Sequence, residues 1–504
     1  MSGAALVGMV MLVVMLFAIF IGFPISFTLL FLALTFGYFG LGEMVFSLAY
    51  FQTIGMMKEE LLAAVPLFIF MGFLTEQAGL MERLFVALRN ILAPIRGSLF
   101  AVVILTATIF AMATGIVGAA VTVLGIMASP IMIKTGYDGR LSAGAITAGG
   151  TLGILIPPSV MLIVMGPVLG VSVADLYASA FGPGFLLASL YLAYLLGRAF
   201  INPKLGPPVP KEERIHGMVA MVKEVLVGVV PLVGLITAAL GSILAGLATP
   251  TEAAGIGALG AALLAAAYGR LSYAGVKRAV LSTTATSSMV LLLATTSNIF
   301  GAVFARFGTA NWITEMMLAL PLPPVMMLIM VLLLIFLLGW PFEWPAIILV
   351  FLPIFYPVMD ALKPTLSDAM GIPVDMVMIW FGALVAVTLQ TAFLSPPVAM
   401  SAYYLRQVVK EWSLATIYKG MFEFMILQVI AISLIVIFPG IATEFPTQLQ
   451  AESRAIKTEE VDDSMNVLEE DPSKSMEEGA EKDTEVEGGG GSLEKDDMSA
   501  KPKK

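Results

Sequence analysis

Long apolar runs, joined by short polar connections, fill this chain up to about residue 441. A helix that crosses a bilayer needs about 20 consecutive apolar residues, and most of the runs reach that length. The pattern therefore predicts an all-α polytopic membrane protein with about 11–12 transmembrane helices. The runs cover residues 4–41 with a break at Pro24, then 60–79, 98–133, 142–172, 178–200, 225–247, 251–268, 279–304, 323–359, 375–405 and 416–441.

Two of these runs are too long for one straight span. At 1.5 Å per residue, the runs 98–133 and 323–359 would each make a helix of more than about 50 Å. Each contains an interruption with glycine, Ala113-Thr114-Gly115 in the first run and Gly339 to Pro345 in the second. We therefore expect two re-entrant helical hairpins, each with its tip inside the membrane.

A tandem proline breaks a further apolar run in each half of the chain. Pro157-Pro158 and Pro396-Pro397 remove backbone donors, which frees carbonyl and amide groups where no water can satisfy them. The order of hairpin and then broken helix recurs in both halves. Matching breaks of this kind are typical of carriers built from inverted repeats, which bind substrate and coupling ion near the membrane midplane. The alternative is that each tandem proline only kinks a helix.

This order divides the chain into five parts. Membrane helices of a scaffold occupy 1–60, the first repeat 61–200 and the second repeat 224–442. The connection 201–223 is rich in proline, lysine and arginine, so the positive-inside rule predicts that it lies in the cytoplasm. The last part, 443–504, is too polar and glycine-rich to bury a core and is expected to be a disordered acidic tail.

The composition is that of a membrane protein, and the net negative charge of the chain is concentrated in its last 61 residues. Of the 504 residues, 59% are hydrophobic and 12% are charged, and a mean hydropathy of +0.95 excludes a soluble globular protein. Cysteine is absent, so the chain has no disulfide, thiolate metal site or thiol nucleophile. From Glu444 onward there are 18 acidic and 8 basic residues, out of 36 and 27 in the whole chain, so the net charge of -9 belongs to the tail.

Sequence motifs of enzymes are missing or out of context. The glycine pattern from Gly255 to Gly260 follows no strand and lies in an apolar helix, where small residues allow close helix packing. No GxxxxGK followed by Ser or Thr occurs, so ATP is not expected to drive the chain directly. The single histidine, His216, lies in the polar connection. We expect no catalytic residue and no nucleic-acid partner.

The two breaks offer the oxygen ligands that a dehydrated Na⁺ needs. Uncoiled carbonyls and a serine or threonine hydroxyl suit such a hard cation, whereas free amides at half-helix N-termini suit an anion. In the first half the candidate ligands are Thr114 at the hairpin tip and the carbonyls of Gly153, Ile156 and Pro158. In the second half they are Ser395 and the carbonyls of Ala392 and Val398, facing the tip at Gly339.

Three polar side chains are candidates for contact with substrate. Glu343 stands at the second hairpin tip, where it binds substrate or a proton, or else caps the helix that begins at Trp344-Pro345. Gln390 and Thr391 precede the second break and could hydrogen-bond a substrate oxygen or another helix. Glu252 follows a Thr-Pro-Thr sequence, and we expect it to serve only in a helix cap.

The breaks also carry a family resemblance. The sequences from Gly150-Thr-Leu-Gly-Ile-Leu-Ile-Pro-Pro to Ser159 and from Gln390-Thr-Ala-Phe-Leu-Ser-Pro-Pro-Val-Ala to Met400 resemble signatures of the large membrane subunit of tripartite ATP-independent periplasmic (TRAP) transporters. The resemblance covers about residues 4–440. It implies an elevator-type carrier in a bacterial or archaeal cytoplasmic membrane, driven by a Na⁺ gradient. It also implies two partners, a small four-helix membrane subunit and a periplasmic binding protein that delivers an organic acid.

Residue by residue, the resemblance implies two Na⁺ sites and a class of substrate. One site would use Thr114, Gly153, Ile156 and Pro158, and the other Gly339, Ala392, Ser395 and Val398. Many members have Gly and Thr where this chain has Ala392 and Ser395, a change that keeps the carbonyl and the hydroxyl. The sequence Pro341-Phe342-Glu343 resembles members associated with 2-oxo acids, lactate or bulkier organic acids more than those for C4-dicarboxylates or sialic acid.

The sequence thus predicts Na⁺-coupled secondary active import of an organic acid, for example a 2-oxo acid or lactate. A carrier of the same architecture that is coupled to protons through Glu343 is the first alternative. A channel or a membrane-embedded enzyme is the second. The apolar segments hold no paired histidine, cysteine or carboxylate cluster, which argues against the enzyme.

Overall fold

The computed structural model describes residues 3–115, 117–208, 218–396 and 399–452, and within these ranges every regular element is a helix. Ten helices in the described ranges are long and apolar enough to cross a membrane, and shorter apolar helices accompany them. The prediction of an all-α polytopic membrane protein is confirmed. The ten are Gly3–Ile21, Glu60–Gln77, Val117–Lys134, Val173–Ile201, Val222–Leu244, Pro250–Ala267, Tyr273–Arg306, Trp344–Met370, Val374–Leu394 and Leu414–Ile437.

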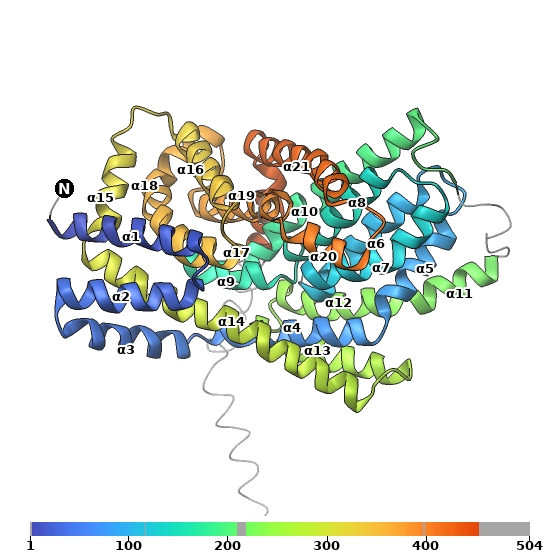
Figure 1. Cartoon of the computed structure of the whole chain (residues 1–504), viewed down its shortest axis with the longest axis horizontal. Helices are drawn as coiled ribbons and strands as arrows, with labels where there is room; N and C mark the ends of the chain where they lie inside the picture. The colour runs from blue at the N-terminus through green and yellow to red at the C-terminus, as the bar shows by residue number, and fades with distance from the viewer. Residues whose placement is uncertain (1–2, 116, 209–217, 397–398, 453–504) are drawn as a thin grey trace, which may run out of the picture. The chain divides into compact units, whose positions relative to one another are not determined.

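The helices of residues 3–92 and of residues 218–318 pack on one another as one set. α1 (Gly3–Ile21) and α2 (Ile25–Leu41) flank the expected break at Pro24, and α3 (Met44–Met57) follows as a helix that the apolar pattern missed. α14 (Tyr273–Arg306) runs beside α2, α3 and α4 (Ala64–Gln77), as Figure 1 shows. The remaining members are η1 (Glu60–Ala63), α5 (Leu80–Leu92), α11 (Met218–Gly228), α12 (Val230–Leu244), α13 (Pro250–Ala267) and α15 (Thr309–Leu318).

The first expected hairpin and broken helix are both present. α6 (Ser98–Thr114) and α7 (Val117–Lys134) pack on each other and are joined at Gly115, which has a φ of 59°. Only glycine adopts that conformation without strain. α8 (Gly139–Thr151) then tightens into the short 3₁₀ helix η2 (Leu152–Ile154), and α9 (Val160–Leu169) begins after the tandem proline.

The second half repeats this order. α16 (Pro324–Leu338) turns back at residues 339–343 into a helix built of α17 (Trp344–Ala346), the π-helical turn η4 (Ile347–Phe351) and α18 (Leu352–Met370). α19 (Val374–Leu394) ends before the second tandem proline, and α20 (Met400–Val408) follows it. A hairpin and then a broken helix therefore occur in both halves, as predicted.

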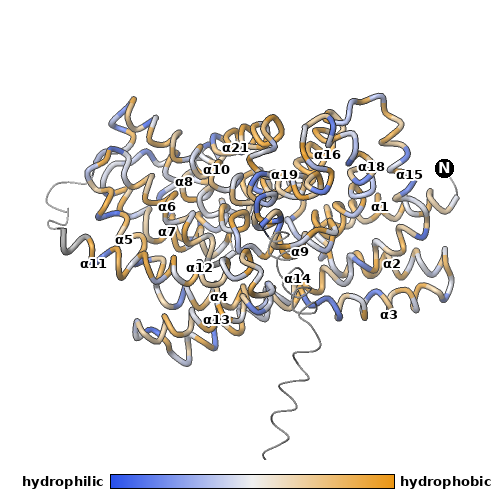
Figure 2. The backbone as a smooth tube through the Cα atoms, turned by 180° about the vertical axis from the view of Figure 1, so that it is seen from behind, coloured by the Kyte–Doolittle hydropathy of each residue, from blue (hydrophilic) through white to orange (hydrophobic). Residues whose placement is uncertain are grey.

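Two long helices hold the broken helices from the side. α10 (Val173–Ile201) and α21 (Leu414–Ile437) both pack on α8 and α19. The apolar stretch of α19 is entirely buried, and the Trp380 indole N–H donates a hydrogen bond of 3.1 Å to the Ile435 carbonyl on α21. Figure 2 shows apolar residues along most of the helices and hydrophilic residues mainly at their ends and connections.

Two predicted boundaries differ from the structure. A separate helix covers residues 440–452, most of it inside the expected tail 443–504, and its Phe445 packs edge-on against Phe181 with ring centroids 6.0 Å apart. α11 begins at Met218, inside the expected connection 201–223. The rest of the tail, 453–504, and residues 209–217 lie outside the described residues. The expected cap at Glu252 is confirmed, since Thr249 and Glu252 form a reciprocal capping box at the start of α13.

Candidate functional site

The tip of the first hairpin lies against the first break. A Cβ atom added to Gly115 would lie 3.7 Å from the Val160 amide nitrogen and 3.9 Å from the Gly153 carbonyl oxygen. Thr114 is the last residue of α6, next to this contact, but its side chain lies outside the described part of the chain. The backbone of the first hairpin tip therefore lies against the backbone of the first broken helix, as the sequence predicted.

The proline at position 157 leaves the Gly153 carbonyl without its helical partner. In an α-helix this oxygen would accept from the amide four residues later, which a proline does not have. No described residue donates a hydrogen bond to the Gly153 oxygen. The next carbonyl, of Ile154, loses its partner to Pro158 in the same way and accepts instead from the Ser159 hydroxyl. Ile156 and Pro158 are buried, and their carbonyl oxygens also receive no hydrogen bond from a described residue.

The second half has the same arrangement. A Cβ atom added to Gly339 would lie 3.0 Å from the Ala392 Cβ and 3.3 Å from its Cα, so this tip touches the second break. Pro396 is four residues after Ala392, and no described residue donates to the Ala392 oxygen. In each half, therefore, the tip glycine packs on a residue whose carbonyl has lost its helical donor to a proline and receives no hydrogen bond from the described residues.

Ser395 is buried in the second break, with 1% of its surface exposed. Its hydroxyl donates a hydrogen bond of 2.7 Å to the Thr391 carbonyl, and it lies 3.1 Å from the Met425 sulfur on α21. Because the Ser395 hydroxyl donates its proton, its oxygen keeps lone pairs that are able to coordinate a cation. Val398, the last ligand candidate, lies outside the described residues.

A cavity of about 220 Å³ lies where the two hairpin tips and the two breaks meet α14. The hairpins contribute Gly115, Val117, Gly118, Glu343, Trp344 and Pro345, and the breaks contribute Ile154, Val160, Phe393, Met400 and Tyr404. Ile69 of α4 and Thr286, Met289 and Val290 of α14 close the other side. The cavity thus joins both repeats and the long helix that runs beside them.

Glu343 lines this cavity from the N-cap position of α17. Its backbone carbonyl accepts from the Ala346 and Ile347 amides, but its side chain makes no capping hydrogen bond. The preceding Phe342 is buried between Phe351, with ring centroids 5.1 Å apart, and Phe20 of α1, at 6.3 Å. The aromatic contacts of Phe342 hold the second hairpin tip in place, and the Glu343 side chain lines the cavity without capping the helix.

The structure places the other two substrate candidates outside the cavity lining. Gln390 and Thr391 are fully buried in α19. The Thr391 hydroxyl bonds back to the Thr388 carbonyl at 2.6 Å, and neither atom of the Gln390 amide has a hydrogen-bond partner among the described residues.

Sequence reasoning missed Tyr404, which also lines the cavity. A Cβ atom added to Gly118 would lie 2.9 Å from the Tyr404 Cζ and 3.1 Å from both Cε atoms, so the ring lies flat over this glycine of the first hairpin. A glycine three residues after the tip was the available signal. It did not reveal which aromatic ring from the second half would cover it.

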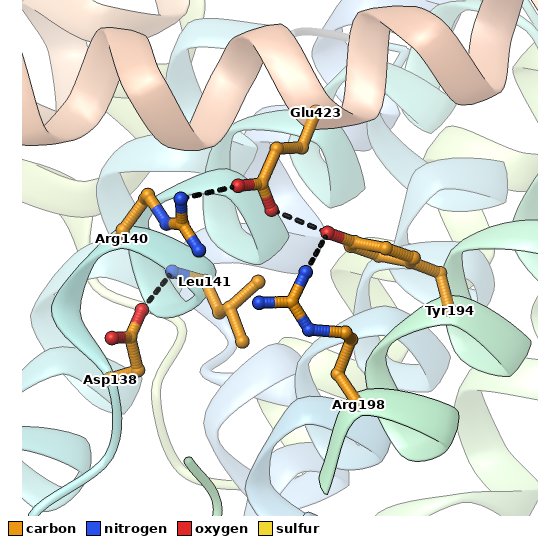
Figure 3. Close-up of polar contacts among 6 residues, drawn as sticks. All are labelled: Asp138, Arg140, Leu141, Tyr194, Arg198 and Glu423. Atoms are coloured by element: carbon orange, nitrogen blue, oxygen red, sulfur yellow. Dashed lines mark hydrogen bonds and ion pairs between the residues drawn. The ribbon is translucent and has the colours of Figure 1, made fainter. Parts of the chain in front are cut away.

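A polar network braces the helices around the breaks. Arg140 of α8 forms an ion pair of 2.8 Å with Glu423 of α21, and the Tyr194 hydroxyl of α10 donates to the same carboxylate at 2.5 Å (Figure 3). Arg198 donates to the Tyr194 oxygen at 2.8 Å, and the Asp138 carboxylate caps α8 at the Leu141 amide. These contacts link α8, α10 and α21, so they fix the positions of the helices that flank the breaks.

Comparison with known proteins agrees with this architecture. A family model described as "Tripartite ATP-independent periplasmic transporter, DctM component" matches residues 10–441. The chain is 27% identical to the sialic acid TRAP transporter large permease protein SiaM of Vibrio cholerae, over 85% of this chain and 96% of that protein. It is 26% identical to the C4-dicarboxylate TRAP transporter large permease protein DctM of Rhodobacter capsulatus, over 77% of this chain and 87% of that protein.

The chain is also similar to a third TRAP permease and to one solved transporter structure. The ectoine TRAP transporter large permease protein TeaC of Halomonas elongata is 25% identical, over 86% of this chain and 97% of that protein. The solved structure of the Alcanivorax borkumensis YdaH transporter superposes with a TM-score of 0.55 at 17% identity, over 80% of this chain and 90% of that one. At that level of identity the superposition shows a shared fold.

Proposed function

This chain belongs to the DctM component family of tripartite ATP-independent periplasmic transporters, and on that premise we propose that it imports a small organic acid by Na⁺-coupled secondary active transport. It would do so in the cytoplasmic membrane, together with a small membrane subunit of four helices and a periplasmic binding protein that delivers the substrate. Its relatives are named for sialic acid, C4-dicarboxylates and ectoine. The small cavity has room only for a compact acid, and 2-oxo acids and lactate are both of that size.

One observation carries the proposal: in both halves a hairpin tip glycine packs on a residue whose carbonyl has lost its helical donor to a proline and has no donor among the described residues. An unpaired buried carbonyl is costly, and a hard cation that takes oxygen ligands can compensate for it. The first Na⁺ would bind to Thr114, Gly153, Ile156 and Pro158. The second would bind to Gly339, Ala392, Ser395 and Val398.

The same geometry supports coupling between ion and substrate. Gly115 contacts Gly153 and also lines the cavity, and Glu343 follows Gly339 by four residues. A cation that draws a tip onto its break therefore shapes the cavity wall. Coupling requires that Na⁺ and substrate each favour the same state. In the elevator movement that we propose, the hairpins and breaks move together, and only the closed, loaded cavity crosses the membrane.

Glu343 supports a second candidate, coupling to protons. Its carboxylate lines the cavity and is not used as a cap, so it could carry a proton with the substrate. The two proposals differ in the gradient that drives uptake.

Uptake into proteoliposomes that contain this chain, its small subunit and its binding protein tests the proposal. We expect uptake of a radiolabelled organic acid to require an inward Na⁺ gradient and the binding protein. Uptake driven by a proton gradient without Na⁺ would reject the cation sites in favour of Glu343, and ohmic, unsaturable flux would indicate a channel.

A further inference from the structure

The cavity between the hairpin tips has an unbalanced set of polar groups. Glu343 supplies a carboxylate, Tyr404 and Thr286 supply hydroxyls, and Trp344 supplies an indole N–H. The other lining residues are apolar or glycine. An ionised carboxylate only accepts hydrogen bonds, an indole N–H only donates, and a hydroxyl does either.

The charge in this cavity is negative only. No lysine, arginine or histidine occurs among the described residues of its lining, and Glu343 has no ion-pair partner in the described part of the chain. A substrate with one carboxylate can direct that group to the Tyr404 and Thr286 hydroxyls, which can donate hydrogen bonds to it. A substrate with two carboxylates has no cationic side chain for the second one, and like charges in a site of low dielectric repel.

The polar groups come from separate elements, so they can contact different groups of one ligand. Glu343 lies on the second hairpin, held by the buried Phe342, and Tyr404 lies on α20 with its ring against Gly118 of the first hairpin. Thr286 belongs to α14. An acceptor and several donors around one small space match a ligand that has an acceptor group and a donor group of its own.

We propose that this cavity selects a small monocarboxylate that carries a hydroxyl or ammonium group, and that it discriminates against 2-oxo acids and dicarboxylates. The Tyr404 and Thr286 hydroxyls donate to the substrate carboxylate, and Glu343 accepts from the substrate's own donor. A 2-oxo acid offers Glu343 only another acceptor. The inference rests on the proposed function, since it assumes that this cavity is the transport site.

Size supports the same class. The cavity of about 220 Å³ has room for about seven waters at ~30 Å³ each. Ligand sites for larger molecules are commonly about 300–1,000 Å³. A three- or four-carbon acid therefore suits the space.

Lactate, pyruvate and malate form a matched set of probes, because lactate has one carboxylate and a hydroxyl, pyruvate replaces the hydroxyl by an oxo group, and malate adds a second carboxylate. Isothermal calorimetry of the purified complex of large and small subunits in NaCl would give the three Kd values without the selectivity of the binding protein. We expect lactate to bind about tenfold more tightly than pyruvate, the effect of one hydrogen bond to a charged group. We expect it also to bind more tightly than malate, because the second carboxylate of malate is repelled by Glu343.

Two variants assign the roles. Glu343→Gln should bring the three Kd values within about threefold of one another, because an amide donates as well as accepts and carries no charge. Tyr404→Phe should weaken all three acids alike, because it removes a donor to the carboxylate that they share. Glu59→Gln, outside this cavity, and Tyr403→Phe, an exposed neighbour on α20, are matched controls that should change no Kd.

Several outcomes would overturn the inference. Wild-type protein that binds pyruvate or malate as tightly as lactate would contradict it, even if the variants fail to fold. A Glu343→Gln variant that keeps the lactate preference would show that Glu343 does not select. If no acid binds at millimolar concentration, the cavity is not the site, while Na⁺-driven uptake by the three-part system would still support the proposed function.

Discussion

Replacing Gly339 by alanine is the sharpest test of the tip and break contact. The added methyl group would lie 3.0 Å from the Ala392 Cβ, 3.1 Å from the Phe336 carbonyl oxygen and 3.3 Å from the Ala392 Cα. These neighbours are backbone atoms or a Cβ, so none can rotate away. The hairpin tip must move from the break by about 0.5–1 Å to reach ordinary van der Waals distance.

This movement sets the expected magnitude. Forcing a methylene group into a packed interior costs typically about 1–3 kcal/mol. If the Gly339 and Ala392 carbonyls share a cation, the bound state bears that cost, because cation binding requires the close approach. Each 1.4 kcal/mol is a factor of ten in an equilibrium constant, so we expect the half-saturating Na⁺ concentration to rise by about 5- to 150-fold.

The assay is the Na⁺ activation curve of substrate uptake in proteoliposomes. Gly301→Ala is the matched control, since Gly301 lies in α14 and a Cβ there meets no atom within 4 Å. The double variant Gly339→Ala with Ala392→Gly removes the nearest clash and should recover part of the Na⁺ affinity. A Gly339→Ala protein that reaches the membrane and keeps the wild-type Na⁺ curve would refute the reasoning.

Three further predictions follow from other contacts. Ser395→Ala should raise the half-saturating Na⁺ concentration several-fold through loss of a hydroxyl ligand, whereas Ser433→Ala on α21 should not; equal curves would remove Ser395 from the ligand set. Truncation after residue 452 should leave uptake intact, whereas truncation after 437 removes the Phe445 packing on Phe181 and should lower the Tm. Glu423→Ala leaves Arg140 without its ion pair and should destabilise the protein by about 1–3 kcal/mol, seen as a lower Tm in detergent; an unchanged Tm would show that the network is dispensable.

The sequence predicted the hairpins and the breaks because glycine and proline act through the backbone itself. Pro157 and Pro396 lack an amide wherever they stand, and Gly115 permits a positive φ that other residues avoid. Such effects are local, so they can be read without knowledge of the fold. The pairing of each tip with its own break also followed, since the same order recurred in both halves.

The side chains that line the cavity could not be predicted in the same way. α19 is buried on every side, so its sequence has no polar stripe to reveal which face meets the cavity, and Gln390 and Thr391 lie elsewhere. Tyr404 reaches the cavity because α20 packs on α7, a contact between segments almost 300 residues apart in the sequence. Those positions depend on helix rotation and tertiary packing, which composition and spacing do not contain.

The recurrence of one arrangement in both halves gives a physical reason for coupling. Pro157 and Pro396 each deprive a carbonyl of its helical donor, which destabilises the closed tip as long as no ligand satisfies that oxygen. In our proposal a cation reverses this balance at each break, and a ligand shifts a conformational equilibrium only by its differential affinity for the two states. Gly115 and the segment from Gly339 to Glu343 both contact a break and form the cavity wall. Substrate that needs the closed wall and Na⁺ that needs the closed tip would therefore stabilise the same state.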